Sequence, residues 1–204
     1  MRVWRAVCFA AVVSGLAGRA LAADPRYPDW PCAQAKVPEV SLAAVWNGPA
    51  LDDATTKWQD NPKVSALATR LAARRTPLDE AEKAVSEFLS EAPAEKTERG
   101  KLLFAGLFEK LNAERNTVMN GLERTTRKQR EAAEKVRSDT LALQALQDAA
   151  NKDQAKIDEL SNQLVWETRI FEDRRRVIKF VCEVPTAIDQ RLFALARAIQ
   201  QEME

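Results

Sequence analysis

The sequence predicts an all-α protein with a small helical head, a projecting antiparallel coiled-coil hairpin and an extended, proline-rich N-terminal arm. Charged residues make up 30% of the 204 residues, aromatic residues only 6%, and glycine is scarce, which is typical of long amphipathic helices. Beyond residue 60, apolar residues recur with the spacing of helix faces. No proline occurs between Pro93 and Pro185, so long helices are permitted there.

Residues 1–22 have the three parts of a secretory signal peptide. Two arginines precede an apolar run at residues 6–16, and small residues follow, so we expect cleavage near Ala22. The run is shorter than the roughly 20 apolar residues of a membrane-spanning helix, and Arg19 follows it. We therefore expect a periplasmic or secreted chain with no membrane span.

Charge and composition argue against several classes of function. Without the signal peptide the chain keeps 28 of its 31 basic residues and all 30 acidic residues, a net charge of about −2. Nucleic-acid binders are usually strongly basic, so we expect no nucleic-acid partner. The chain has no histidine, phosphate-binding loop, nucleophile elbow or paired-cysteine metal motif. We therefore expect no enzyme, no metal site and no cofactor.

The cysteines predict a disulfide. Loss of the signal peptide removes Cys8 and leaves Cys32 and Cys182 in an oxidising compartment. Two thiols suit one bond, which would tie the arm to the helical body. The alternative is a pair of free thiols, one of them redox active, although the chain has no C-x-x-C spacing.

Residues 23–53 are predicted to form the extended arm. Five prolines occur there, and each lacks an amide donor and restrains the residue before it. The segment carries more large apolar side chains than a disordered linker would, so we expect it to cover the core. These side chains are Trp30, Val37, Val40, Leu42, Val45 and Trp46.

The helical domain is predicted over residues 54–204 and starts with two short helices. Asn61 followed by a proline predicts a cap and a helix over residues 63–74. Thr76 and Pro77, followed by two acidic residues, predict a second helix over residues 77–91. The short connection makes the two an antiparallel pair.

Residues 95–184 are predicted to form the long hairpin. A single straight helix of this length would extend roughly 130 Å, so we expect the segment to fold back on itself. Heptad spacing over residues 118–146 and 157–181 predicts an antiparallel coiled coil with its tip at 148–153. A tip at Ser138 and Asp139 is the alternative.

With the tip at 148–153, the numbers of two residues that face each other across the hairpin should sum to about 300. This register places Gln129 opposite Phe171. Glu167 and Arg174 then fall at seam positions. Polar residues there either specify the register at some cost in stability or lie at the flank of a slightly rotated seam.

Residues 186–204 are predicted to form the last helix, with Thr186 as its cap and Asp189 completing a capping-box spacing. Its apolar stripe should pack at the base of the hairpin and complete the head. The apolar residues expected at that base are Leu103, Phe104, Leu107, Phe108 and Leu111.

One set of residues is a candidate binding site for an anion or a partner. The hairpin register brings eight basic residues near one another, and we call this set the basic girdle. Its members are Arg124, Arg127, Lys128, Arg130, Arg174, Arg175, Arg176 and Lys179. Guanidinium groups pair well with oxyanions. The alternative is a solvated face that neighbouring acids neutralise.

The tryptophans at positions 30, 46, 58 and 166 are expected to serve as core or arm-docking residues. Trp166 and Ile170 fall beside the predicted seam. They are candidates to receive Trp30 if the arm runs along the hairpin.

The arm motif "DWPC", the following "VPEVSLAAVWNGP", and the later "WETRIFEDRRR" and "CEVPTAIDQRLFALARAI" resemble a group of uncharacterised secreted proteins of proteobacteria. The resemblance covers most of the chain after residue 22. It implies an exported helical protein of a bacterial envelope, and it carries no activity or ligand.

These features predict an exported periplasmic interaction module, a scaffold, adaptor or accessory subunit that binds an envelope protein through helix faces. Homodimerisation through the same seam is a second arrangement. The alternatives are a holdase-like periplasmic chaperone and, less favoured, a small helical enzyme or binding protein for an anionic ligand.

Overall fold

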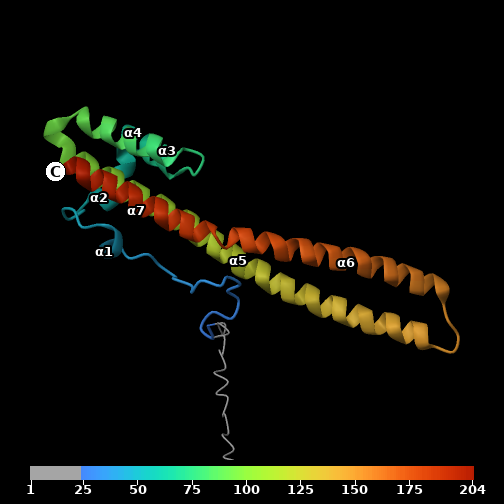
Figure 1. The fold of residues 1–204 in the computed structure, drawn as a ribbon. Helices are drawn as coiled ribbons and strands as arrows, with labels where there is room; N and C mark the ends of the chain where they lie inside the picture. Colours follow the sequence, from blue (N-terminus) through green and yellow to red (C-terminus); the bar gives the residue numbers. More distant parts are fainter. Residues whose placement is uncertain (1–23) are drawn as a thin grey trace, which may run out of the picture.

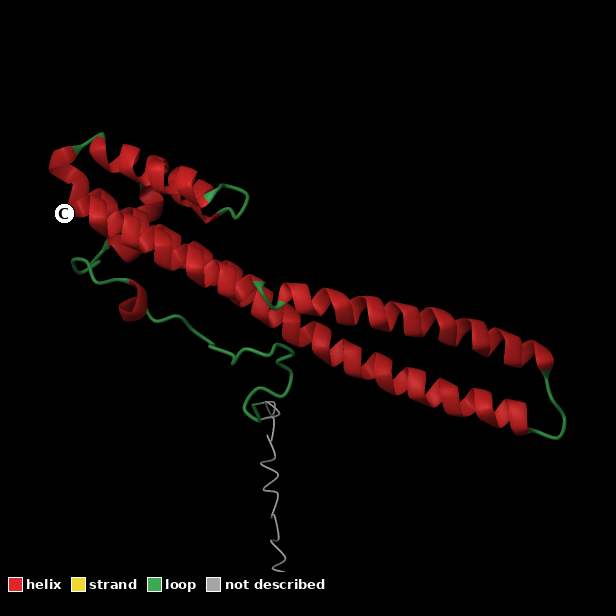
Figure 2. Ribbon diagram, in the orientation of Figure 1, coloured by secondary structure: helices red, strands yellow, loops and turns green. Residues whose placement is uncertain are grey.

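The computed structural model describes residues 24–204, and within this range every regular element is a helix (Figure 1). Figure 2 shows these helices with the loops that join them. The predicted signal peptide, residues 1–22, lies outside the described residues. The fold is all-α, as composition and helical spacing predict.

One helix, α5 (Lys96–Asp148), runs through the molecule and contacts most other elements. Its 53 residues make it about 80 Å long. Helix α6 (Gln154–Val181) runs back along the second half of α5, and α7 (Val184–Met203) packs on the first half (Figure 1). The second half of α5 and α6 therefore form a hairpin that projects from the head.

The head is built on the first half of α5. Helices α3 (Pro62–Ala72) and α4 (Leu78–Ser90) follow one another across a short connection (Figure 1). They were predicted to pair with each other, but α3 packs mainly against α5 and α4 against α7, because the long helices present the larger apolar faces. The Asn61 side chain caps α3 by accepting two amide hydrogens of its first turn, at 3.1 and 3.2 Å. Helix α3 thus begins at the predicted cap.

Three short elements complete the head, and the sequence did not predict them. Helix α2 (Ala54–Lys57) and the 3₁₀ helix η1 (Trp58–Asp60) place Trp58 against α3 and α5. A second 3₁₀ helix, η2 (Pro93–Glu95), leads from α4 into α5.

The core of the head is a single apolar cluster. Its largest fully buried side chains come from α3, α4, α5 and α7. They are Leu71, Leu89, Leu103, Phe104, Leu107, Leu111, Ile188, Leu192, Leu195 and Ile199. Four of the five residues predicted at the base of the hairpin are among them, and Phe108 packs against the cluster partly buried. Burial of this set is the main favourable contribution to folding.

The arm is irregular apart from the short helix α1 (Leu42–Val45). Val45 and Trp46 are buried in the head as predicted, and the Trp46 ring stacks on Phe104 with 4.1 Å between centroids. Val37 and Leu42 are instead exposed, by 52% and 38%. Val37 does not cover the core because this part of the arm is held through its backbone carbonyl groups.

The last helix begins two residues earlier than predicted. Helix α7 starts at Val184 with Pro185 in its first turn and no side-chain cap, so the predicted capping role of Thr186 is wrong. The first turn tolerates proline because its amide has no partner within the helix. The chain therefore breaks at Cys182 and Glu183, before the proline rather than at it.

The hairpin turns at residues 149–153, within the predicted range. The alternative tip at Ser138 and Asp139 is wrong, because α5 continues unbroken to Asp148. The predicted register is observed directly, since Gln129 Nε2 donates a hydrogen bond to the carbonyl oxygen of Phe171 at 2.6 Å.

The middle of the hairpin seam is polar. Lys135 forms ion pairs with Asp139 at 2.6 Å and with Glu167 at 2.8 Å. Gln163 donates hydrogen bonds to the same two carboxylates. Glu167 therefore lies in the seam with a partner, whereas Arg174 is exposed at its flank. Most seam residues are only partly buried, so the hairpin gains less from apolar burial than the head does.

Two glycines of α5 provide a matched test of this packing. A Cβ atom at Gly106 would lie 2.8 Å from the Trp58 ring, whereas one at Gly121 would meet only the Arg124 guanidinium at 3.9 Å. We expect Gly106→Ala to lower the free energy of unfolding by about 1–2 kcal/mol, since overpacking outweighs the gain in helix propensity.

Gly121→Ala should raise the free energy of unfolding by about 0.5–1 kcal/mol, because alanine favours the helix and nothing obstructs its methyl group. Urea titration followed by circular dichroism measures both variants. Equal effects of the two substitutions would contradict the packing around Trp58.

Candidate functional site

A disulfide joins the arm to the hairpin at the point where α6 ends. Cys32 and Cys182 are bonded with an S–S distance of 2.07 Å and their Cα atoms 5.5 Å apart. The Gln34 side chain also donates a hydrogen bond to the carbonyl oxygen of Cys182. The bond closes a loop across 150 residues, which in the chain-entropy model stabilises the fold by about 5 kcal/mol. The predicted disulfide is confirmed.

A buried arginine holds the next part of the arm. Arg115 of α5 has a side chain only 4% exposed and pairs with Asp189 of α7 at 2.8 Å. It also donates hydrogen bonds to the carbonyl oxygens of Val37 and Pro38, at 2.6 and 3.3 Å. Burial raises the pKa of Asp189, although the nearby arginine acts in the opposite direction. One guanidinium therefore connects α5, α7 and the arm.

Three ion pairs fix another part of the arm on α5. Lys36 pairs with Glu123 at 2.5 Å, and Asp29 pairs with both Arg127, at 2.7 Å, and Arg130. The hydrogen bond from Arg127 lowers the pKa of Asp29 below its ordinary value. Residues three and four apart share one face of a helix, so Glu123, Arg127 and Arg130 lie on the same side of α5. We call this side of the hairpin, with Cys182 on α6, the arm face.

The structure divides the basic girdle among three settings. Arg127 and Arg130 bind the arm. Arg175 and Arg176 each pair with an acidic residue three positions earlier on α6. The other four form no ion pair with any residue in the range 24–204; they are Arg124, Lys128, Arg174 and Lys179. The girdle is thus partly neutralised, as the alternative interpretation held, and partly available to an outside group.

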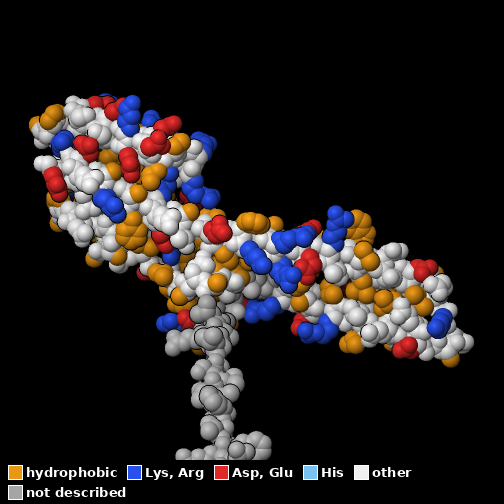
Figure 3. Space-filling view, viewed as in Figure 1, with side chains coloured by type: hydrophobic (Ala, Val, Ile, Leu, Met, Phe, Trp, Pro, Cys, Tyr) orange, Lys and Arg blue, Asp and Glu red, His pale blue; other side chains and the backbone are white. Residues whose placement is uncertain are grey.

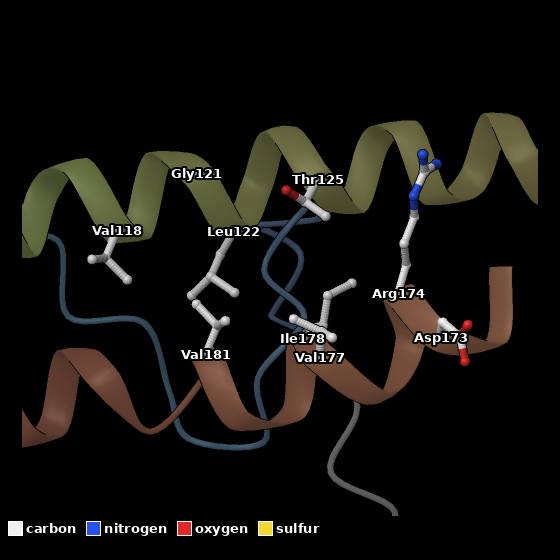
Figure 4. A pocket seen from close by; sticks show the side chains of 9 residues that line it. All are labelled: Val118, Gly121, Leu122, Thr125, Asp173, Arg174, Val177, Ile178 and Val181. Carbon is white, nitrogen blue, oxygen red and sulfur yellow. The ribbon is translucent and has the colours of Figure 1, made fainter. Parts of the chain in front are cut away.

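An apolar groove lies between α5 and α6 at the base of the hairpin. Its volume is about 440 Å³, and its apolar lining comes from Val118 and Leu122 of α5 and from Val177, Ile178 and Val181 of α6. Figure 4 shows these side chains directed into the space between the helices, with Arg174 extending from α6 toward α5. Gly121 also lines the groove, and the absence of a side chain there leaves it open.

A second apolar stripe runs beside the groove on α6. We call Trp166, Ile170, Val177 and Phe180 the exposed stripe; Trp166 is 62% and Phe180 71% exposed. Its members precede the seam residues of α6 by one position, as Gly121 precedes Leu122 on α5. In an antiparallel pair of helices, residues one position before the seam lie on the same side of both helices. The exposed stripe of α6 and Gly121 of α5 therefore share one side of the hairpin, opposite the arm face, and we call it the free face. Figure 3 shows hydrophobic side chains exposed on the hairpin among lysines and arginines.

The proposed docking of Trp30 on Trp166 and Ile170 is wrong. Both of these residues are exposed, by 62% and 46%, and the Trp30 indole donates a hydrogen bond to the carbonyl oxygen of Gln34 within the arm. The arm follows the arm face near α5 instead. Trp46 and Trp58 are core residues, as expected.

Sequence reasoning missed several residues of the site. Nothing in the pattern marked Arg115, Asp29 or Lys36, because each acts on a segment at least 70 positions away along the chain. Val177 and Phe180 could have been found from the spacing of the exposed stripe, in which residues 166, 170, 177 and 180 follow heptad positions.

Within residues 24–204, no group of three or more Cys, Asp or Glu side chains is arranged to hold a metal ion. None of the helices in this part of the chain has enough length and apolar character to cross a membrane. The chain matches no family model, no curated protein and no solved structure. Function is therefore inferred from the geometry of the arm face and the free face.

The disulfide predicts a large effect on stability. We expect the Cys32→Ser and Cys182→Ser double variant to unfold with a free energy about 2–5 kcal/mol lower than the oxidised protein, because its unfolded chain is less constrained. Urea titration measures the change, and thiol counting of the denatured wild type serves as control. Two titratable thiols in the exported wild type, with equal stability of the variant, would contradict the clamp.

The Asp29 contact predicts a pH dependence. Because the pKa of Asp29 is lowered in the folded protein, the contact contributes fully above the ordinary value of 3.8 and is lost as pH falls through the lowered value. Amide chemical shifts of residues 27–30, followed by NMR from pH 7 to pH 2, should report this release.

Asp29→Asn should show the released spectrum at every pH. Glu39→Gln, at an exposed arm residue that forms no ion pair within residues 24–204, should titrate like the wild type. Identical titrations of all three proteins would show that Asp29 does not hold the arm.

Proposed function

We propose that this protein is an exported helical interaction module, an adaptor or scaffold that binds a protein of the bacterial envelope through its projecting hairpin. The observation that supports this most is the asymmetry of the hairpin. Its arm face is occupied by the chain's own N-terminal arm, while its free face keeps Trp166, Ile170, Val177 and Phe180 exposed beside an apolar groove. Exposed apolar groups that cluster beside a groove are typical of interaction sites.

Export to the periplasm or beyond is part of the proposal. The Cys32–Cys182 disulfide supports it, because such bonds persist in oxidising compartments and are rare in the cytosol. The predicted signal peptide agrees with the same compartment and would be removed near Ala22.

The mechanism we propose is recognition by helix faces. The head provides a stable base, and the disulfide and Arg115 fix the base of the hairpin to it, so the free face is presented without a large ordering cost on binding. Aromatic and arginine side chains contribute most of the energy at many interfaces, and Trp166, Phe180 and Arg174 are of these types.

A holdase-like chaperone is the second candidate, and one observation favours it. Leu141 and Val165 are 60% and 65% exposed nearer the hairpin tip, outside the exposed stripe. A chaperone would use such scattered apolar groups to hold many clients. The anionic-ligand alternative has less support, since Arg127 is bound to Asp29 and Arg174 borders an open groove with an almost wholly apolar lining.

The test is capture of a tagged, natively exported copy after mild lysine crosslinking in intact cells, followed by mass spectrometry. We expect one dominant partner at fixed stoichiometry, linked to hairpin lysines such as Lys128, Lys156 and Lys179. Head lysines such as Lys63 and Lys83, which are also exposed, serve as internal controls.

Links confined to the head, or a protein recovered without partners, would contradict an interaction module that acts through its hairpin. A broad set of unrelated exported proteins would favour the chaperone instead.

A further inference from the structure

The spacing of the exposed stripe suits a helical partner. If Asp173 is included between Ile170 and Val177, the stripe residues from 166 to 180 are spaced by four, three, four and three positions. This is the heptad spacing of a helix that packs along another helix. Helix α6 thus carries two heptad stripes on adjoining faces, one paired with α5 and one uncovered. The uncovered stripe is about 21 Å long, which matches four turns of a partner helix.

The groove supplies the second wall of such a site. Val177 belongs to both the exposed stripe and the groove, and Gly121 opens the groove on the α5 side. A helix lying along α6 at this position would place side chains into the groove, so that three helices share one apolar seam. A flat bilayer surface cannot enter the groove, so the concave shape favours a protein ligand over a membrane.

The charges around the free face select the partner's chemistry. Arg124 lies over Gly121, and Arg174 borders the groove; neither forms an ion pair within residues 24–204. Lys128 follows Arg124 by one turn of α5 on the same face. On the outer side of the stripe, the Arg169 guanidinium lies 5.9 Å from the centre of the Trp166 ring. The apolar strip is therefore bordered mostly by cations, with Asp173 as the acid within it and Glu131 three residues beyond Lys128 on the α5 side.

A second copy of this chain is a poor occupant. A two-fold axis through the middle of the stripe would align the apolar residues, with Trp166 against Phe180 of the second copy. It would also bring Asp173 against the same residue of the second copy and place the arginine borders together. Like charges facing each other across an interface are unfavourable, so the charge pattern disfavours self-association.

We infer that the free face docks an amphipathic helix with acidic flanks, supplied by an exported protein partner. This inference rests on the proposed function and names the partner's chemistry. The helix packs its apolar side chains between the exposed stripe and the groove. Its Asp and Glu residues pair with Arg124, Arg174 and Lys128 at the edges.

The experiment places a photo-crosslinking amino acid at Val177 on the free face and, as the matched control, at Val165 on another side of α6. These two valines are 57% and 65% exposed, so solvent access is similar. Each full-length protein is expressed with natural export, irradiated in intact cells, and its adducts are identified by mass spectrometry. We expect the Val177 probe alone to link one exported protein, at a segment with heptad apolar spacing flanked by Asp and Glu.

Charge reversal separates recognition from mere proximity. Arg124→Glu together with Arg174→Glu should lower the Val177 adduct at least about tenfold, as the loss of two charge pairs predicts. Arg137→Glu, elsewhere on the hairpin and paired with Glu134, should leave the adduct unchanged. Gly121→Leu, which fills the groove without a clash at Cβ, should also remove the adduct, whereas Thr140→Leu at an exposed site should not.

Several results would overturn the inference. The first is an adduct of Val177 with a second copy of this chain, with phospholipid, or with a segment that lacks acidic flanks. The second is an adduct that survives the double charge reversal. The third is the absence of any adduct at Val177. If the lysine crosslinks of the wild type still report a partner on the hairpin, the proposed function stands and only the docking face is wrong. If neither experiment finds a partner, both fall.

Discussion

The fold depends on burying the apolar residues of one long helix, α5, whose two halves differ in composition and in the helices that pack on them. The first half of α5 is apolar on several sides, with Phe104 and Leu107 fully buried, and α3, α7 and η1 surround it. Among residues 24–204, the second half has α6 as its only helical neighbour, and its seam contains Gln129 and Asp139, so apolar burial alone stabilises it less. The partner of α5 also changes from α7 to α6 along its length. The junction between the two is the place where the hairpin needs additional support.

The arm supplies that support on one side only. The disulfide at Cys182 lies where α6 ends, and Arg115 ties the arm to α5 and α7 within the same region. The disulfide and the hydrogen bonds of the buried Arg115 guanidinium both resist separation of the helices there. Because the arm follows the arm face, the free face at the same level keeps its groove and exposed stripe uncovered. The proposed function and the docking inference both follow from this asymmetry.

Short-range patterns in the sequence predicted the position of the hairpin turn and the register of the hairpin. Heptad spacing predicted the turn at residues 148–153, where the structure has it at 149–153, and aligned Gln129 with Phe171, because seam residues repeat along each helix. The start of α7 was predicted too late, since a proline in a first turn leaves the boundary open by a few residues. The role of Arg115 was not predictable, because its acceptors are backbone carbonyls 77 and 78 positions away. The basic girdle was predicted as one set, but the path of the arm, which no local pattern encodes, decides which of its members are neutralised.

The central claim is that the clamped arm covers one face of the hairpin and leaves the other exposed, and hydroxyl-radical footprinting with mass spectrometry tests it most directly. Met119 is the reporter of the arm face, because it lies one turn from Arg115, which holds Val37, and is only 3% exposed. Trp166 reports the free face. The account predicts that Met119 is protected in the oxidised protein and reactive after reduction, while Trp166 reacts in both. Equal reactivity of the two residues in the oxidised protein, or a Trp166 as protected as the buried Trp58, would contradict it.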